Sequence, residues 1–200
     1  MNEILLATHN PGKVHEYTEL LADLDIILMS LSDVGITLEV EEKGQSYEEN
    51  ALLKVEAYGK ASGMVTLADD SGIEVDVLNG EPGILSARYG GVTGRAQHQH
   101  LLGKLIGVPL EERNARFRCV TMLWEPGGQV HKGEGIVEGR IAFEPIGNKG
   151  FGYDPLFFID EYETTMAQLN VEIKNQISHR SRALHALRPH LAMILGKNAT

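Results

Sequence analysis

The feature that most constrains the fold of this chain is the alternation of short apolar runs with segments of helical periodicity. Residues 4–7 and 26–29 are short apolar runs of the kind that forms buried strands. The segment between them, residues 13–21, has its apolar side chains on one helical face: Val14, Tyr17, Leu20 and Leu21. Strands separated by a helix indicate an α/β fold, and the first part of the chain therefore predicts that class.

A second predicted helix begins after Ser46, because Ser46 and Glu49 have the spacing of a capping box, and it ends at Gly63. Two predicted strands follow, at residues 64–68 and 73–77. The Asp-Asp-Ser-Gly sequence between them is interpreted as a turn that closes one strand and opens the next.

The middle of the chain is rich in turn residues and strands. Residues 79–94 contain five glycines and a proline, which predicts a long loop. Residues 96–106 are predicted to form a helix that Gly107 closes. Residues 115–124 and 129–135 flank a Glu-Pro-Gly-Gly sequence, which predicts a hairpin.

The C-terminal part completes the predicted fold. Residues 156–159 are another short apolar run, and the tail from Ser178 has helical periodicity, which Pro189 is expected to kink or split. The expected class is α/β, with a mixed sheet flanked by helices. We expect one domain over residues 1–200, elongated into two lobes with a substrate cleft between them.

Charge and composition narrow the partners. The 18 basic and 28 acidic residues give a formal net charge of −10, which repels the backbone of nucleic acids and argues against bulk DNA or RNA as a partner. An anionic small molecule fits only where a few cations converge and a metal ion offsets the acids. The single cysteine, Cys119, excludes an internal disulfide. No apolar run approaches the ~20 residues of a membrane span and no secretory signal is visible, so we expect a cytoplasmic protein.

One candidate for phosphate binding lies between the first strand and the first helix. A helix N-terminus at that place has free N–H groups and a partial positive charge. The segment is not a Walker A loop, and an ordinary turn is the alternative. Lys13 opposes the helix dipole in the first turn, which a bound anion explains. The segment consists of Thr8, His9, Asn10, Pro11, Gly12 and Lys13.

Two acidic groups are candidate metal ligands. Asp69 and Asp70 are adjacent, so their side chains point to opposite faces of a strand and at most one of them faces a cleft. Glu39, Glu41 and Glu42 form the second group. A solvated turn and a charged surface are the alternatives for the two groups. Together they have the oxygen ligands that Mg²⁺ prefers.

Two further segments and two single cations are ambiguous when each is taken alone. Residues 178–180 read as an N-cap serine before two exposed side chains, and residues 151–154 read as a hydrophobic turn. Arg88 and Lys174 are cations to which the sequence assigns no partner. A pair of histidines at residues 98 and 100 splays by about 200° around a helix and cannot chelate one metal ion.

Taken in order, six motifs resemble the inosine/xanthosine triphosphate pyrophosphatase family. They cover nearly the whole chain, and six motifs at the proper spacing are far more specific than any one of them. The motifs are Ala-Thr-His-Asn-Pro-Gly-Lys at 7–13, Tyr-Glu-Glu-Asn-Ala with Lys54 at 47–54, Ala-Asp-Asp-Ser-Gly at 68–72, Pro-Gly-Ile-Leu-Ser-Ala-Arg-Tyr at 82–89, Phe-Gly-Tyr-Asp-Pro at 151–155 and Ser-His-Arg at 178–180.

The resemblance implies hydrolysis of a purine nucleoside triphosphate such as ITP, dITP or XTP to the monophosphate and pyrophosphate. It also implies a long mixed sheet, a homodimer and Mg²⁺ as cofactor. Asp70 is implied as the catalytic residue and a metal ligand, and Glu42 as a further metal ligand. The implied substrate-binding residues are Thr8, His9, Asn10, Pro11, Gly12, Lys13, Ser71, Phe151, Gly152, Tyr153, Asp154, Lys174, His179 and Arg180, with the last two at the base.

The departures from the family pattern are few. His9 occupies a position that is often a small residue, and residues 90–100 lack the acid-and-asparagine pattern common there, so no site residue is assigned in that segment. Two other functions stay open: a pyrophosphatase of pyrimidine or modified nucleotides, and a non-catalytic nucleotide-binding module. A pair of acids suited to a metal argues against the second.

Overall fold

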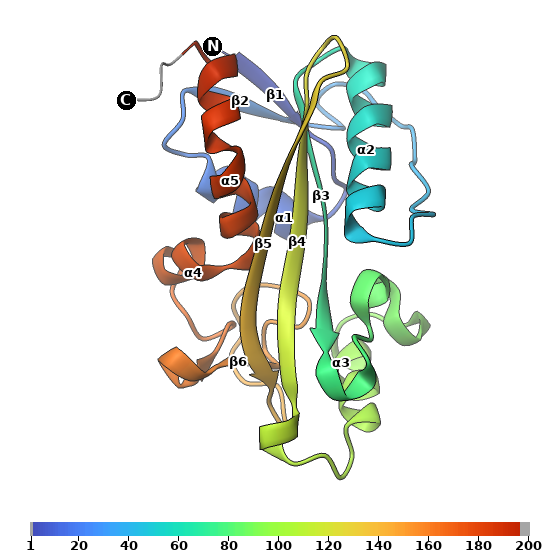
Figure 1. Cartoon of the computed structure of the whole chain (residues 1–200), viewed down its shortest axis with the longest axis vertical. Helices are drawn as coiled ribbons and strands as arrows, with labels where there is room; N and C mark the ends of the chain where they lie inside the picture. Colours follow the sequence, from blue (N-terminus) through green and yellow to red (C-terminus); the bar gives the residue numbers. More distant parts are fainter. Residues whose placement is uncertain (1, 197–200) are drawn as a thin grey trace. The chain divides into compact units, whose positions relative to one another are not determined.

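The structure of the protein is a computed structural model that describes residues 2–196. Within these residues the strands form one seven-stranded sheet in the order β2-β1-β3-β4-β5-β6-β7 (Figure 1). β1 pairs in parallel with β2 and β3, whereas β6 pairs antiparallel with β5 and β7. The expected mixed sheet is therefore confirmed. The strands are β1 Asn2–Leu6, β2 Ile26–Ser30, β3 Thr66–Val75, β4 Asn114–Trp124, β5 Val130–Ile141, β6 Phe157–Ile159 and β7 Thr164–Thr165.

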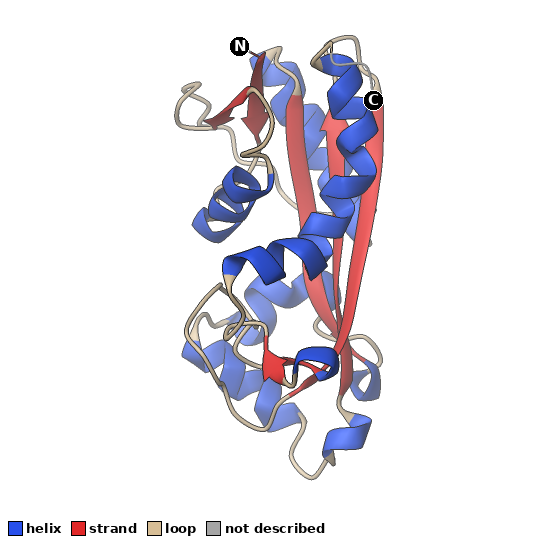
Figure 2. Cartoon of the chain, turned by 90° about the vertical axis from the view of Figure 1, so that its left-hand side faces the viewer, coloured by secondary structure: helices blue, strands red, loops and turns tan. Residues whose placement is uncertain are grey.

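Helices accompany the strands, as Figure 2 shows in blue beside red. α1 and α2 begin at side-chain caps: Asn10 caps α1, and the Ser46 hydroxyl accepts from the backbone N–H of Glu49 at 3.1 Å, as its capping box predicts. Gly63 ends α2 with a φ of 67°. The α-helices are α1 Pro11–Leu20, α2 Tyr47–Ser62, α3 Arg95–Lys104, α4 Val171–Ile177 and α5 His179–Ile194.

The described residues divide into two compact units, each with its own core. The first contains residues 2–70, 119–135 and 179–196, and the second contains residues 71–118 and 136–178. Leucines of α1, α5 and the neighbouring strands fill the core of the first unit. In the second, α3 packs against residues of β3, β4 and β5. A single domain and a substrate cleft stay predictions.

The structure corrects several sequence-based expectations about the elements. Residues 69–72 do not form a turn, because β3 runs without interruption from Thr66 to Val75. The expected loop at residues 79–94 contains the 3₁₀ segment η2, Gly83–Gly91. α4 has no predicted counterpart. α5 is not split at Pro189, because it continues to Ile194 with buried side chains on both sides of the proline, so core packing outweighs the roughly 3 kcal/mol cost of proline in a helix. A kink at Pro189 stays a prediction.

No helix within residues 2–196 is long and apolar enough to cross a membrane.

Close contact between β5 and α5 requires glycine in the strand. A Cβ atom on Gly133 would lie 2.0 Å from the backbone oxygen of Ala183 in α5. We expect Gly133→Ala to lower the free energy of unfolding by about 1–3 kcal/mol, because the helix must move. Gly103→Ala is the matched control: its Cβ meets nothing within 4 Å, and alanine favours a helix by about 1 kcal/mol. Urea titrations of both variants measure the difference, and equal stability of the two would refute the close-packing argument.

Candidate active site

The N-terminus of α1 is already capped by the chain itself. Asn10 Oδ1 accepts from the N–H groups of Gly12 and Lys13 at 2.9 and 3.2 Å, and Pro11 has no N–H. The free N–H groups expected at this turn are therefore occupied, which corrects the sequence-based picture of phosphate binding. Side-chain donors of this segment that can meet an anion include the Asn10 amide nitrogen and the hydroxyl of Thr8, which accepts from the Asn10 N–H at 3.1 Å.

The other members of this segment differ in exposure. His9 is exposed, and its ring makes an edge contact with Tyr58 of α2 at a centroid distance of 6.4 Å. Lys13 is half-buried, and its Nζ lies 3.1 Å from Asp69 Oδ1 and 3.4 Å from the Asp69 carbonyl oxygen. The anion that explains a lysine in the first turn of α1 is therefore present within the protein as Asp69.

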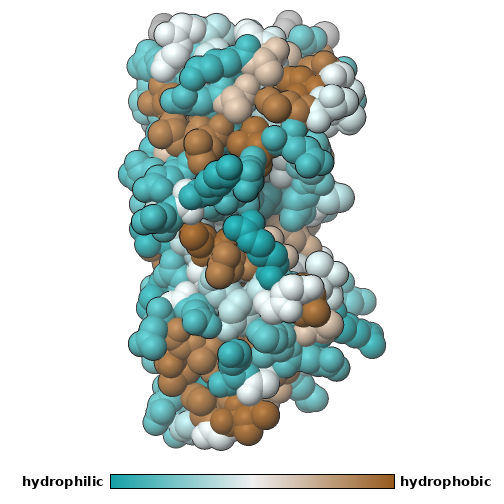
Figure 3. All heavy atoms as spheres, turned by 90° about the vertical axis from the view of Figure 1, so that its right-hand side faces the viewer, coloured by the Kyte–Doolittle hydropathy of each residue, from teal (hydrophilic) through white to brown (hydrophobic). Residues whose placement is uncertain are grey.

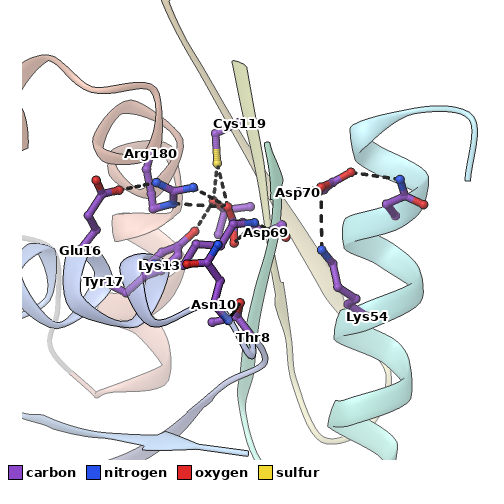
Figure 4. Close-up of polar contacts among 12 residues, drawn as sticks. Thr8, Asn10, Lys13, Glu16, Tyr17, Lys54, Asp69, Asp70, Cys119 and Arg180 are labelled. Atoms are coloured by element: carbon purple, nitrogen blue, oxygen red, sulfur yellow. Dashed lines mark hydrogen bonds and ion pairs between the residues drawn. The ribbon is translucent and has the colours of Figure 1, made fainter. Parts of the chain in front are cut away.

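Asp69 and Asp70 face different elements, as the strand geometry predicts (Figure 4). The Asp69 side chain faces α1 and α5, where its carboxylate forms ion pairs with Lys13 and Arg180. Asp70 contacts α2, where Asn50 Nδ2 donates to its Oδ2 at 3.0 Å. The two neighbouring carboxylates consequently have separate surroundings and separate roles.

Asp69 is the centre of a buried ionic network (Figure 4). Arg180 donates to Asp69 Oδ2 from Nε at 3.3 Å and from Nη2 at 3.1 Å, and its Nη1 donates to Glu16 of α1. The Cys119 thiol lies 3.6 Å from the same Asp69 oxygen. Burial raises the pKa of the Asp69 carboxyl, but Lys13 and Arg180 outweigh it and hold that pKa well below its usual range.

Two other groups respond to the same network. Burial and the Asp69 charge raise the pKa of the Cys119 thiol to about 12, so it stays protonated and unreactive. Burial lowers the pKa of Arg180, but the Asp69 and Glu16 carboxylates raise it well above its ordinary value.

Both His179 and Arg180 are buried, at 5% and 1% exposure, so the alternative of two exposed side chains after an N-cap serine is wrong.

Asp70 has the opposite electrostatic character. It is 6% exposed, and burial raises its pKa more than Lys54 and Lys13 lower it, while Glu42 raises it further. Lys54 Nζ lies 2.5 Å from Glu42 Oε1 and 3.9 Å from Asp70 Oδ1. Asp70 is therefore a carboxylate with increased proton affinity, as a general base requires.

The two predicted metal ligands fit a hard divalent cation. Glu42 and Asp70 both contact the Lys54 ammonium, so the two carboxylates converge on one position where positive charge is stabilised. Within residues 2–196 no group of three or more histidine, cysteine, aspartate or glutamate side chains is arranged to hold a metal ion. Mg²⁺ typically takes one or two carboxylates and completes its shell with water and phosphate oxygens.

The remaining predicted residues belong to the second unit. The Asp154 carboxylate accepts from the Phe151 N–H at 2.9 Å and from Lys174 Nζ at 2.6 Å, and the same ammonium lies 5.7 Å from the Phe151 ring. Three of the predicted residues therefore meet at the turn of residues 151–154. Ser71 follows Asp70 in β3 and is half-buried.

Sequence analysis assigned no role to the residues that contact the two aspartates, although Asn50 and Lys54 belong to one of the six motifs. Asn50 and Lys54 lie one turn apart on α2, and Glu16 follows Lys13 by three positions on α1. The i, i+3 and i, i+4 spacings could have indicated that each pair shares a helical face. No signal in one sequence shows that Lys13, Asp69 and Arg180 meet, because they are 56 and 111 positions apart.

Comparison with known proteins places the chain in a family. The model of the Ham1 family matches residues 4–190, and the chain belongs to this family. A protein named dITP/XTP pyrophosphatase from Bacillus subtilis is 47% identical over 189 residues, which cover 94% of this chain and 96% of that protein. A protein of the same name from Geobacter sulfurreducens is 47% identical, with 96% and 97% of the two chains covered. The six-motif resemblance is thereby confirmed.

Solved structures agree with this assignment. The Staphylococcus aureus Ham1 protein matches with a TM-score of 0.84 and 41% identity, covering 96% of this chain and all of that one. A HAM1 protein from Coxiella burnetii matches with a TM-score of 0.83 and 38% identity over 98% of this chain and 99% of its own.

The different surroundings of the two aspartates predict effects of different size on stability. Asp69→Asn leaves Arg180 and Lys13 without their shared carboxylate, and we expect a loss of about 3–5 kcal/mol in the free energy of unfolding at pH 7. Asp70→Asn removes a carboxylate whose charged form burial disfavours, and we expect a change within about 1 kcal/mol.

The pH dependence has a defined sign. Because the folded pKa of Asp69 is depressed, its stabilising effect is full above the unfolded value of about 3.9 and is lost as the pH falls toward the folded pKa. Denaturant titrations from pH 7 down to pH 3 should therefore show the gap between wild type and Asp69→Asn narrowing below about pH 4. A gap that is constant across this range would contradict the role assigned to the Asp69 charge.

Proposed function

We propose that this protein hydrolyses non-standard purine nucleoside triphosphates (ITP, dITP and XTP) to the monophosphate and pyrophosphate. The observation that carries the proposal is the 47% identity, over nearly the whole of both chains, with proteins named dITP/XTP pyrophosphatase. The geometry is consistent with it, because the buried Asp70 carboxyl of raised pKa and the predicted phosphate-binding segment with Lys13 belong to the same compact unit.

The proposed reaction is an in-line attack of water on a phosphoanhydride. Asp70 orients the water and accepts its proton, because its raised pKa makes it a stronger base than an ordinary aspartate. Asn50 fixes the Asp70 carboxylate by donating to one of its oxygens. Thr8, Asn10 and Lys13 bind the phosphates through their side chains, since the N–H groups at the start of α1 are occupied.

The proposed cofactor is Mg²⁺, held by Glu42 and Asp70. When bound, the ion neutralises charge on the phosphates and on the leaving pyrophosphate. Lys54 contacts both carboxylates, so its ammonium group partly neutralises their negative charge. The Lys54 side chain must therefore move when a cation binds to the same carboxylates.

Base recognition is proposed for His179, Arg180 and the turn of residues 151–154. An arginine has hydrogen-bond donors and no acceptor. It can therefore donate to the 6-oxo group of a purine, and it does not pair with the 6-amino group of adenine. The Arg180 guanidinium already donates to Asp69 and Glu16, so its orientation is fixed before any substrate arrives. Lys174 and Ser71 are proposed to contact the substrate as well.

A homodimeric, cytoplasmic protein also stays a prediction. Apolar side chains are exposed on the surface, Ile106 to 83%, Met193 to 65% and Phe143 to 60%. Figure 3 shows apolar side chains in separate groups among polar ones on one face. Light scattering in solution measures whether two copies associate.

A panel of nucleoside triphosphates with Mg²⁺ tests the activity. We expect ITP, dITP and XTP to be hydrolysed with release of pyrophosphate, and ATP and GTP to be poor substrates. Asp70→Asn should lower kcat by at least ~10²-fold, because the general base is lost while the fold is kept. Release of orthophosphate, or preference for a pyrimidine or modified nucleotide, would point to a different phosphatase. Binding of ITP without turnover by wild type would instead indicate a nucleotide-binding module.

Metal dependence gives a second test. We expect activity to require Mg²⁺, with Mn²⁺ as a substitute, because oxygen ligands select hard cations. Glu42→Gln should raise the Mg²⁺ concentration needed for half-maximal rate. The exposed neighbour Glu41, paired with Lys43 at 2.9 Å, is the control, and Glu41→Gln should leave the requirement unchanged. Full turnover of ITP in excess EDTA contradicts this part of the proposal.

A further inference from the structure

A histidine of α3 contacts the turn of residues 151–154 that is proposed to bind the base. His98 Nε2 lies 2.7 Å from the carbonyl oxygen of Gly152. A carbonyl oxygen only accepts hydrogen bonds, so Nε2 is the donor in this contact. His98 is 8% exposed, and its Nδ1 is buried with no hydrogen-bond partner among residues 2–196. The ring is therefore held in place through Nε2.

The neighbouring residue of α3 strengthens the same contact region. Gln97 Nε2 donates to the Ser86 carbonyl oxygen at 2.6 Å, and the Tyr153 hydroxyl donates to that same oxygen at 3.3 Å. The His98 and Tyr153 rings lie 6.1 Å apart between centroids. Two consecutive side chains of α3 thus contact residue 152 directly and residue 153 through Ser86.

The two ends of the turn are held differently. Asp154 binds the Phe151 N–H and the Lys174 ammonium, which ties the first residue of the turn to the last. Gly152 has a φ of 59° and no Cβ to pack, so its own side chain does not restrain it. The bond from His98 supplies that restraint at the middle of the turn.

We propose that His98 is a positioning residue for purine binding, which acts by fixing the backbone of Gly152 and with it the orientation of Phe151 and Tyr153. The proposal rests on the proposed function, in which this turn contacts the base. A binding surface that is rigid beforehand loses less conformational entropy when the ligand binds. His98 should therefore affect the affinity for the base more than the rate of the chemical step.

Three substitutions separate the hydrogen bond from the bulk of the ring. Glutamine places an amide nitrogen near the position of Nε2 and can donate to Gly152, whereas asparagine is too short and leucine has no donor. Relative to wild type, we expect His98→Leu and His98→Asn to raise KM for ITP about 5–10-fold, the effect of one lost hydrogen bond, with kcat within about twofold. His98→Gln should restore KM to within about twofold of wild type.

Two controls accompany the kinetics. His100→Leu alters the other histidine of α3, whose ring contacts Tyr89 at 4.8 Å between centroids, and KM for ITP should not change. Inorganic tripolyphosphate has no base, so its inhibition constant should be the same for wild type and all His98 variants. A thermal melt of each variant verifies that the enzyme is folded at the assay temperature.

A measurement without substrate separates this proposal from the proposed function. Hydrogen–deuterium exchange of the backbone amides of residues 151–154 should accelerate in His98→Leu and His98→Asn, and not in His98→Gln. If wild type does not hydrolyse ITP, the proposed function fails, and the exchange rates still report whether His98 holds the turn. Unchanged exchange in all three variants, or an equal rise of KM in His98→Gln and His98→Leu, overturns the proposal. A lower melting temperature with unchanged KM would show that His98 is structural only.

Discussion

The buried contact between Asp69 and Arg180 fixes the relation between three distant segments of the chain. Asp69 belongs to β3, Arg180 to the first turn of α5 and Glu16 to α1, and the guanidinium binds both carboxylates. Burying these charges is costly unless each one has a partner, so the three elements are favoured only in the arrangement that pairs them. Lys13 joins the same carboxylate, which fixes the proposed phosphate-binding side chain in that arrangement.

This network also explains how two adjacent aspartates acquire different chemistry. The alternation of side chains along a strand sends Asp69 to two strong cations and Asp70 to an amide and a more distant ammonium. The first keeps its charge at any physiological pH, whereas burial makes the second a better proton acceptor. The interruption of β3 that the sequence indicated would have removed this distinction, because side chains in a turn do not alternate.

The elements that the sequence predicted well are those with a local cause. The cap at Ser46, the glycine stop at Gly63 and the hairpin between β4 and β5 depend on residues within a few positions of each other. The failures have distant causes. The two aspartates of β3 are typical of a turn, and the sequence does not show that buried cations such as Arg180 compensate their charge. Pro189 is typical of a helix break, and the sequence does not show the buried contacts that keep α5 continuous.

The candidate site follows the same division. The motifs identified Asp70, Lys13 and Glu42, but the partners that set their protonation and orientation come from other elements. His98 is a sharper case. The sequence analysis asked only whether His98 could bind a metal ion together with residue 100, and rejected that possibility. In the structure His98 contacts Gly152, which is 54 positions away.

The charge balance of the first unit bears on the proposed need for a divalent cation. Among residues 2–196, the ion pairs that connect the two aspartates with their neighbours involve the basic side chains of Lys13, Lys54 and Arg180 and the acidic side chains of Glu16, Glu42, Asp69 and Asp70. This cluster therefore has no surplus of positive charge with which to neutralise a bound triphosphate. The proposed phosphate-binding segment does not supply one either, because Asn10 accepts from the N–H groups of Gly12 and Lys13 at the start of α1. A protein of net charge −10 has no general attraction for the anion, so the balancing charge has to arrive with the substrate. The convergence of Glu42 and Asp70 on one ammonium marks the position in this unit where such a cation is best stabilised.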